Sequence, residues 1–274
     1  MSSHPQLRAT LATAFTASLA LSQAGPSHAI TLADPSLIQS VRPDEPYGDT
    51  FWNYSTGSFS AVSSVNGSRG SVSTVLGQSP TITAEVQTGS TGYVSASNKL
   101  SYQLAYINPT GSHDWLNVSV QAFDNLLAQG SAPSGGYYRS YTWSKLSLTG
   151  PASDTVYTGY HCSSASTSAA YQPCGGTPSL PIQPFSVNLR QNTVYTVQMQ
   201  LYAEANAFSN NGTAIGLASS VLDPSFAVSG AAPAGGHFIF SPGVSPVPEA
   251  ASWAMLLAGL TCVAGAAQQR RRKA

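Results

Sequence analysis

The chain is short of charge. Only 8% of its 274 residues are Asp, Glu, Lys or Arg, against about 25% in an ordinary soluble domain. Ten acids and six bases fall between residues 30 and 245, which gives that part a net charge of about −4. A negative domain lacks the basic surface that holds a phosphate backbone, so we do not expect nucleic acid as a partner.

The sequence also lacks the common motifs of catalysis. It has no Gly-x-Ser-x-Gly elbow, no His-Glu-x-x-His, no Cys-x-x-Cys and no phosphate-binding glycine loop. We therefore expect no enzymatic activity, no cofactor and no metal ion. Two weaker alternatives stay open. Asp124 and Glu204 are candidates for a glycosidase pair, which requires two carboxylates about 5–10 Å apart, and the acidic residues Asp44, Glu45 and Asp49 are candidate Ca²⁺ ligands.

The first 29 residues have the three parts of a secretory signal peptide. Arg8 supplies the basic start, residues 9–21 are mainly apolar, and Ser27-His28-Ala29 is a small-residue cleavage site. A retained transmembrane helix is the alternative, but an apolar run of about 13 residues is short for a span. We expect export by the Sec machinery and cleavage after Ala29.

The last residues predict a membrane helix. No residue from Ala250 to Ala267 is charged, and a helix of this length spans about 27 Å, enough for a bilayer core. Pro248 and Glu249 precede it, and a basic cluster follows it, made of Arg270, Arg271, Arg272 and Lys273. Such a cluster stays in the cytoplasm, so the domain before the helix is expected outside.

This order of Pro-Glu, apolar helix and basic cluster resembles the PEP-CTERM sorting signal over about the last 30 residues. Ala250 stands where that family usually has a second proline, and a plain single-span anchor is the alternative. The resemblance implies that the protein is exported by a Gram-negative bacterium that makes extracellular polysaccharide. It also implies that an exosortase-type transpeptidase recognises the tail. The recognition residues would be Pro248, Glu249, Arg270, Arg271 and Arg272. The protein would be an inner-membrane precursor first and then reach the cell surface or extracellular matrix.

Between the two ends, side chains alternate with the period of β-strands. The clearest case puts Val197, Met199, Leu201, Ala203 and Ala205 on one face. Residues 100–106 and 116–122 alternate in the same way across a turn-rich segment, so we expect them to pair as an antiparallel hairpin. Residues 124–129 indicate a helical turn. Further strands are predicted near 71–76, 82–86, 139–148, 185–190, 214–222 and 236–241.

Many short strands separated by Gly, Pro and Asn turns predict an all-β fold. We expect an antiparallel β-sandwich, with a jelly roll as the main variant. The predicted organisation is a signal peptide at 1–29, a secreted domain at 30–241, a linker with the Pro-Glu motif at 242–249, and the sorting helix with its basic tail at 250–274.

The exported part contains two cysteines, Cys162 and Cys174, in a segment rich in Ser, Thr and Gly that we expect to be a loop. Export permits a disulfide between them. Closing a loop of this size would stabilise the fold by about 3 kcal/mol. Two free thiols are the alternative.

The densest aromatic cluster in the sequence is Tyr137, Tyr138, Tyr141 and Trp143. Aromatic side chains offer an apolar face with a polar handle, so we consider a glycan contact here, with core packing as the alternative. Low charge favours a neutral, hydroxyl-rich polymer. The leading hypothesis is a non-enzymatic surface or matrix protein associated with exopolysaccharide, and its rival is a secreted carbohydrate-active enzyme on the same scaffold.

Overall fold

The computed structural model describes residues 30–43, 50–55, 57–62, 67–77, 80–89, 91–151, 155–168, 171, 173–174 and 180–244. The predicted cleavage site Ala29, the motif Pro248-Glu249, the apolar tail with its basic cluster, and the acidic residues 44–49 lie outside the described residues. Within the described ranges, no helix is long and apolar enough to cross a membrane.

Regular structure in the described part is almost entirely β-strand. The strands are β1 (Ser36–Pro43), β2 (Phe51–Asn53), β3 (Gly57–Val62), β4 (Arg69–Val75), β5 (Thr81–Gln87), β6 (Gly92–Ile107), β7 (Trp115–Ser131), β8 (Tyr137–Thr149), β9 (Thr155–Ser166), β10 (Phe185–Arg190), β11 (Tyr195–Phe208), β12 (Ile215–Val228) and β13 (His237–Phe240).

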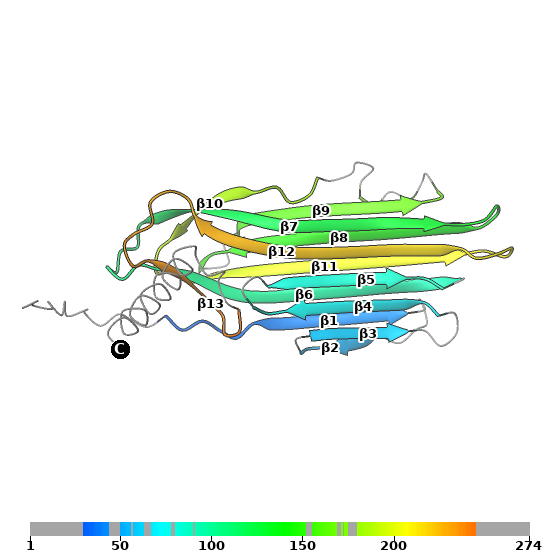
Figure 1. Ribbon diagram of the computed structural model, residues 1–274, viewed down its shortest axis with the longest axis horizontal. Helices are drawn as coiled ribbons and strands as arrows, with labels where there is room; N and C mark the ends of the chain where they lie inside the picture. Colours follow the sequence, from blue (N-terminus) through cyan, green and yellow to red (C-terminus); the bar gives the residue numbers. More distant parts are fainter. Residues whose placement is uncertain are drawn as a thin grey trace, which may run out of the picture.

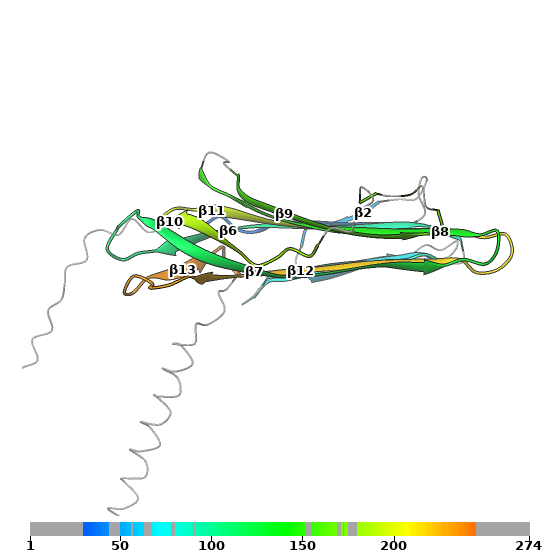
Figure 2. The same ribbon diagram turned by 90° about the horizontal axis from the view of Figure 1, so that it is seen from above.

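These strands form two antiparallel sheets that lie face to face, as Figures 1 and 2 show. Sheet A has the order β2-β1-β6-β11-β8-β9, and β13 also pairs with β6. Sheet B has the order β10-β7-β12-β5-β4-β3. The expected all-β fold with two antiparallel sheets is confirmed.

The core fills the space between the two sheets. In sheet A, Met199 of β11 lies in register between Leu100 of β6 and Leu146 of β8, and all three are at most 1% exposed. Val118 and Val120 of β7 face them from sheet B with no exposure at all. Burying each side chain of this size contributes about 1.5–3 kcal/mol. Because strand residues alternate, every second residue of sheet A is left on its outer face.

The predicted hairpin between residues 100–106 and 116–122 is wrong. The first segment belongs to β6 in sheet A and the second to β7 in sheet B, so the turn carries the chain from one sheet to the other. Asn108 shapes this turn, because its Oδ1 accepts hydrogen bonds from the backbone N and the hydroxyl of Thr110. Two strands that each have one apolar face can bury those faces side by side in one sheet or facing each other from two sheets. The alternation of side chains alone does not distinguish these arrangements.

The predicted helical turn at residues 124–129 is also wrong. β7 continues to Ser131, and residues 124–129 pair with residues 222–217 of β12. Hydrogen bonding along the length of β12 outweighs the weak local preference for a helix.

Candidate functional site

The outer face of sheet A carries a row of aromatic side chains. In the register, Trp143 of β8 lies opposite Tyr202 of β11, and Tyr141 lies opposite Glu204. Their strand neighbours Thr142 and Ser144 are fully buried. Since successive residues of a strand point to opposite faces, the rings are held on the outside by the same alternation that builds the core.

Three of these rings stack across three strands. Trp143 lies between Tyr202 of β11 and Tyr160 of β9, with ring centroids 6.0 and 5.9 Å away and interplanar angles of 21° and 33°. Tyr141 leans on Tyr202 at 5.9 Å and 58°. We call Tyr141, Trp143, Tyr160 and Tyr202 the aromatic cluster. Because the rings lie against one another, each covers part of its neighbour, and Tyr160 at the end of the cluster is 47% exposed.

A hydroxyl network extends from the cluster along the same face. Tyr202 donates a 2.8 Å hydrogen bond to Oε2 of Glu204, and its oxygen lies 3.4 Å from the hydroxyl of Tyr93 on β6. Burial, followed by the hydrogen bond to Tyr93, raises the pKa of Tyr202 far above its ordinary value. Burial and a hydrogen bond to Tyr160 raise the pKa of Tyr141 in the same direction. These phenols therefore stay neutral well above physiological pH. The proton of Tyr202 is already donated to Glu204, and its oxygen can still accept a hydrogen bond.

Sequence reasoning selected four aromatic residues, and the structure separates them. Tyr141 and Trp143 belong to the aromatic cluster. Tyr137 is farther along the outer face, where it stacks on Phe208 at 5.9 Å. Tyr138 faces the interior, where its ring lies so close to Gly130 of β7 that any Cβ there would collide with it.

Sequence reasoning missed Tyr160 and Tyr202. Tyr202 stands on the polar side of the strand that was predicted most clearly, so the alternation already placed it on the outer face. Nothing in the sequence indicated that this strand pairs with the one that holds Trp143. Tyr160 lies just before the cysteine-containing segment that we expected to be a loop, and no strand was predicted there.

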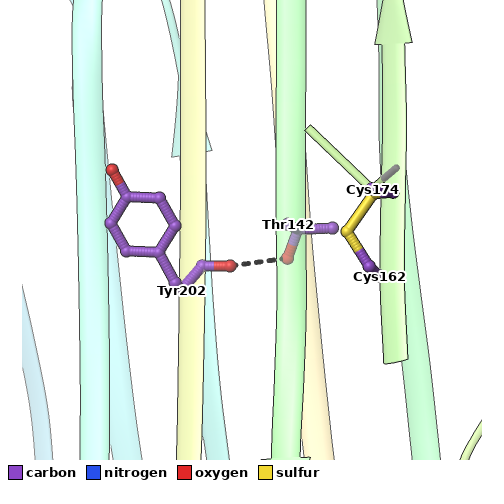
Figure 3. The surroundings of a disulfide bond; sticks show 4 residues. All are labelled: Thr142, Cys162, Cys174 and Tyr202. Atoms are coloured by element: carbon purple, nitrogen blue, oxygen red, sulfur yellow. Dashed lines mark hydrogen bonds between the residues drawn. A yellow bond between two sulfur atoms is a disulfide. The ribbon is translucent and has the colours of Figure 1, made fainter. Parts of the chain in front are cut away.

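The predicted disulfide between Cys162 and Cys174 is present, with Cα atoms 5.7 Å apart. Cys162 lies in strand β9, opposite Trp143, and not in a loop as predicted. Figure 3 shows the bond beside Thr142, whose hydroxyl donates a 2.8 Å hydrogen bond to the carbonyl of Tyr202. The disulfide thus ties the segment after β9 to the edge of sheet A, next to the aromatic cluster.

That segment also contacts the outer face through Tyr171. The guanidinium of Arg139 on β8 lies 5.2 Å from the centroid of the Tyr171 ring, and its Nη2 is 3.9 Å from Oε1 of Glu204. Burial is the main reason that the pKa of Tyr171 rises to about 12. The ion pair with Arg139 balances the charge of Glu204, and the Glu204 carboxylate also accepts a hydrogen bond from Tyr202.

Asp124 and Glu204 do not form a pair of facing carboxylates. Asp124 points into the interior, where its oxygens accept hydrogen bonds from the hydroxyl of Ser144 at 2.7 Å and the backbone N of Ile182 at 3.1 Å, and where it contacts Nδ1 of His161 at 2.8 Å. Glu204 lies on the outer side of sheet A. Asp124 and its partners therefore connect β7, β8 and β9 with the segment before β10. Without Asp124, the polar groups that it pairs would be buried and unpaired.

Several hollows lie along sheet B. One of about 340 Å³ is lined by Gln121, Phe123, Pro184, Asp223 and Ser225 on the outside of sheet B. Over the described ranges, no three His, Cys, Asp or Glu side chains gather as metal ligands would. Comparisons with protein-family models, curated proteins and solved structures found no significant match for this chain.

Proposed function

We propose that this protein is an exported surface or matrix component that binds extracellular polysaccharide through the outer face of sheet A and has no catalytic role. The observation that carries the proposal is the aromatic cluster with its hydroxyl network. Rings that pack on one another on the outer face of a sheet present apolar area beside neutral hydroxyl groups, and this combination matches the alternating C–H and O–H surface of a sugar chain.

The face suits a polymer better than a small molecule. The rings lie across three strands on the outer face of a sheet, whereas sites for small ligands are usually clefts that enclose most of the ligand. Each contact on such a face is worth about 1 kcal/mol, so useful affinity requires many contacts along one chain. We therefore expect weak binding of short oligosaccharides and strong retention by the polymer.

The C-terminal tail supports the part of the proposal that concerns export and surface location. Its resemblance to the PEP-CTERM signal favours sorting by an exosortase-type transpeptidase, with Pro248 and Glu249 as the recognition motif. Deleting the chain after Val247 should then release the domain from the membrane. A truncated protein that stays in the inner membrane after signal cleavage would contradict the anchor.

Affinity electrophoresis tests the glycan proposal. The full chain, kept soluble in a non-ionic detergent, should be retarded in a gel that contains the producing organism's own polysaccharide. Replacing both Tyr141 and Trp143 by Ala should abolish the retardation, whereas Phe123→Ala with Leu127→Ala on the outside of sheet B should not.

Normal migration of the wild-type chain would refute the proposal. The rival, a carbohydrate-active enzyme, predicts something different: shorter saccharides should accumulate when the chain is incubated with the same polymer. Asp124 and Glu204 are not available to it as a pair, because they lie on opposite sides of sheet A.

A further inference from the structure

Basic side chains gather on the outer face of sheet A. Among the described strand residues, this face holds four bases and one acid, namely Arg42, Lys99, Arg139, Lys145 and Glu204. The outer face of sheet B is balanced, with Arg69 and Arg190 against Glu85 and Asp223. The described strand residues of this face therefore carry a net charge of about +3, in a domain whose net charge from residue 30 to 245 is about −4.

Two of these bases are available to a ligand. Lys99 of β6 and Lys145 of β8 both lie opposite Gln200 of β11, one on each side of it. Adjacent strands are about 4.8 Å apart, so the two backbone positions are about 10 Å apart. Neither lysine forms an ion pair with any described residue, whereas the one acid of the face, Glu204, is already paired with Arg139.

The lysines lie directly beside the aromatic cluster. Tyr160 is opposite Lys145 in the register, and Trp143 precedes Lys145 by one outward position on β8. One ligand that lies across β6, β11 and β8 would therefore meet the lysines and the rings together. Two ammonium groups without an ion pair to a described residue, on a hydroxyl-rich face with an excess of bases, favour a ligand with separated negative charges.

We propose that the polymer bound by this face is an acidic polysaccharide, with carboxylates that pair with Lys99 and Lys145 while its sugar rings contact the aromatic cluster. This inference rests on the proposed function and names its ligand class. It replaces the neutral polymer that the low overall charge favours, because the charge of the face and the charge of the domain have opposite signs.

A pair of polymers with the same backbone tests the role of charge. Polygalacturonate and its fully methyl-esterified form differ only in their carboxylates. With EDTA present to exclude calcium bridges, the full chain in non-ionic detergent should be retarded about tenfold more strongly by the acid than by the ester. Raising NaCl from 20 to 300 mM should remove most of this difference, because the Debye length falls to below about 10 Å.

Variants assign the effect to the two lysines. Lys99→Gln with Lys145→Gln should weaken binding to polygalacturonate about five- to tenfold and leave binding to the ester unchanged. Lys99→Arg with Lys145→Arg should keep the wild-type preference. Arg69→Gln with Arg190→Gln removes the same two charges from the outer face of sheet B and should change neither, and thermal unfolding of the lysine variants should match the wild type.

The outcomes separate this inference from the function on which it rests. Equal retardation by both polymers, or retention by the producer's polysaccharide but not by polygalacturonate, would overturn the acidic ligand and leave glycan binding standing. Loss of retention by every polysaccharide would overturn both. Retention by duplex DNA as strong as by polygalacturonate would show a general polyanion surface and refute a polysaccharide ligand.

Discussion

The outer faces of the two sheets are built by the same alternation but carry different side chains. On sheet A, Tyr141, Trp143 and Tyr202 lean on one another and are half-buried, although Tyr160 at the end of the cluster is 47% exposed. On sheet B, Phe123 of β7 stands alone and is 63% exposed, and Leu127 is 42% exposed. A ring that is held by other rings keeps one orientation and loses less entropy when a ligand binds. From this difference we infer that a binding face is better recognised by how firmly its aromatic side chains are held than by how much of their area is exposed.

The largest expected effect concerns the edge of sheet A. Cys162→Ser with Cys174→Ser should lower the free energy of unfolding by about 3 kcal/mol, because the disulfide restricts the unfolded chain. Urea unfolding measures this loss. Hydrogen exchange should accelerate most in β9 and the segment after it, and least in β3 and β10 at the edges of sheet B.

Alkylation without reductant provides the check on that prediction. The wild-type chain should show no free thiol at positions 162 and 174. Complete labelling of both would mean that the disulfide does not form in the protein, and equal unfolding free energies with and without the cysteines would mean that it does not stabilise the fold.

The next effect compares one ring from each face. Trp143→Ala removes a side chain stacked on two others and should cost about 2 kcal/mol of stability. Phe123→Ala on sheet B removes a mostly exposed ring and should cost no more than about 0.5 kcal/mol. Thermal or urea unfolding of the two variants measures the contrast. Equal costs would show that the rings of sheet A are no better fixed than those of sheet B.

Sequence reasoning identified many individual strands, but it missed β1, β2, β3 and β9, took residues 124–129 for a helical turn, and failed where strands meet. The alternation in residues 196–205 was sufficient to identify β11 and to put Tyr202 on its polar side. The aromatic cluster, however, joins residues 143, 160 and 202, and only the register of β8, β9 and β11 brings them together. Periodicity reports which face a residue occupies but not which strand lies beside it, which is also why the β6–β7 hairpin was mispredicted.

The distribution of charged residues shows the same limit of sequence reasoning. The count from residue 30 to 245 gives a negative domain, and from that count a neutral polymer is a reasonable expectation. Among the described strand residues, however, bases outnumber acids four to one on the outer face of sheet A, and a sum over the chain cannot express that. Lys99 and Lys145 are 46 residues apart in sequence, yet both lie opposite Gln200.

A smaller effect is expected at high pH. The folded protein holds the phenolic protons of Tyr202 and Tyr141 with a raised pKa, whereas in the unfolded chain both ionise near pH 10. Their contribution to stability is therefore complete below about pH 10 and is lost as the pH rises beyond it. Buried Tyr102 in the core acts in the same direction.

Urea unfolding between pH 8 and 12 measures this dependence. Tyr202→Phe should reduce the loss of stability above about pH 10, because one phenol with a raised pKa is gone. No tyrosine stands on the outer face of any described strand of sheet B, so the surface part of the effect reports on sheet A. An unchanged slope in Tyr202→Phe would contradict the assignment.

The smallest expected effect tests whether the face or the whole domain sets affinity for an acidic polymer. Glu204→Gln removes the one acid among the described strand residues of the outer face of sheet A and frees Arg139 for the ligand, while the amide oxygen can still accept the hydrogen bond of Tyr202. Retardation by polygalacturonate should increase about twofold, as expected for one exposed charge.

Glu85→Gln makes the same change in net charge on the outer face of sheet B. The two faces are separated by a core about 10 Å thick plus their own side chains, roughly two Debye lengths at 0.1 M salt, so Glu85→Gln should leave retardation unchanged at that salt concentration. An equal gain in both variants would mean that net charge alone governs binding and that the distinction between the two faces has no part in it.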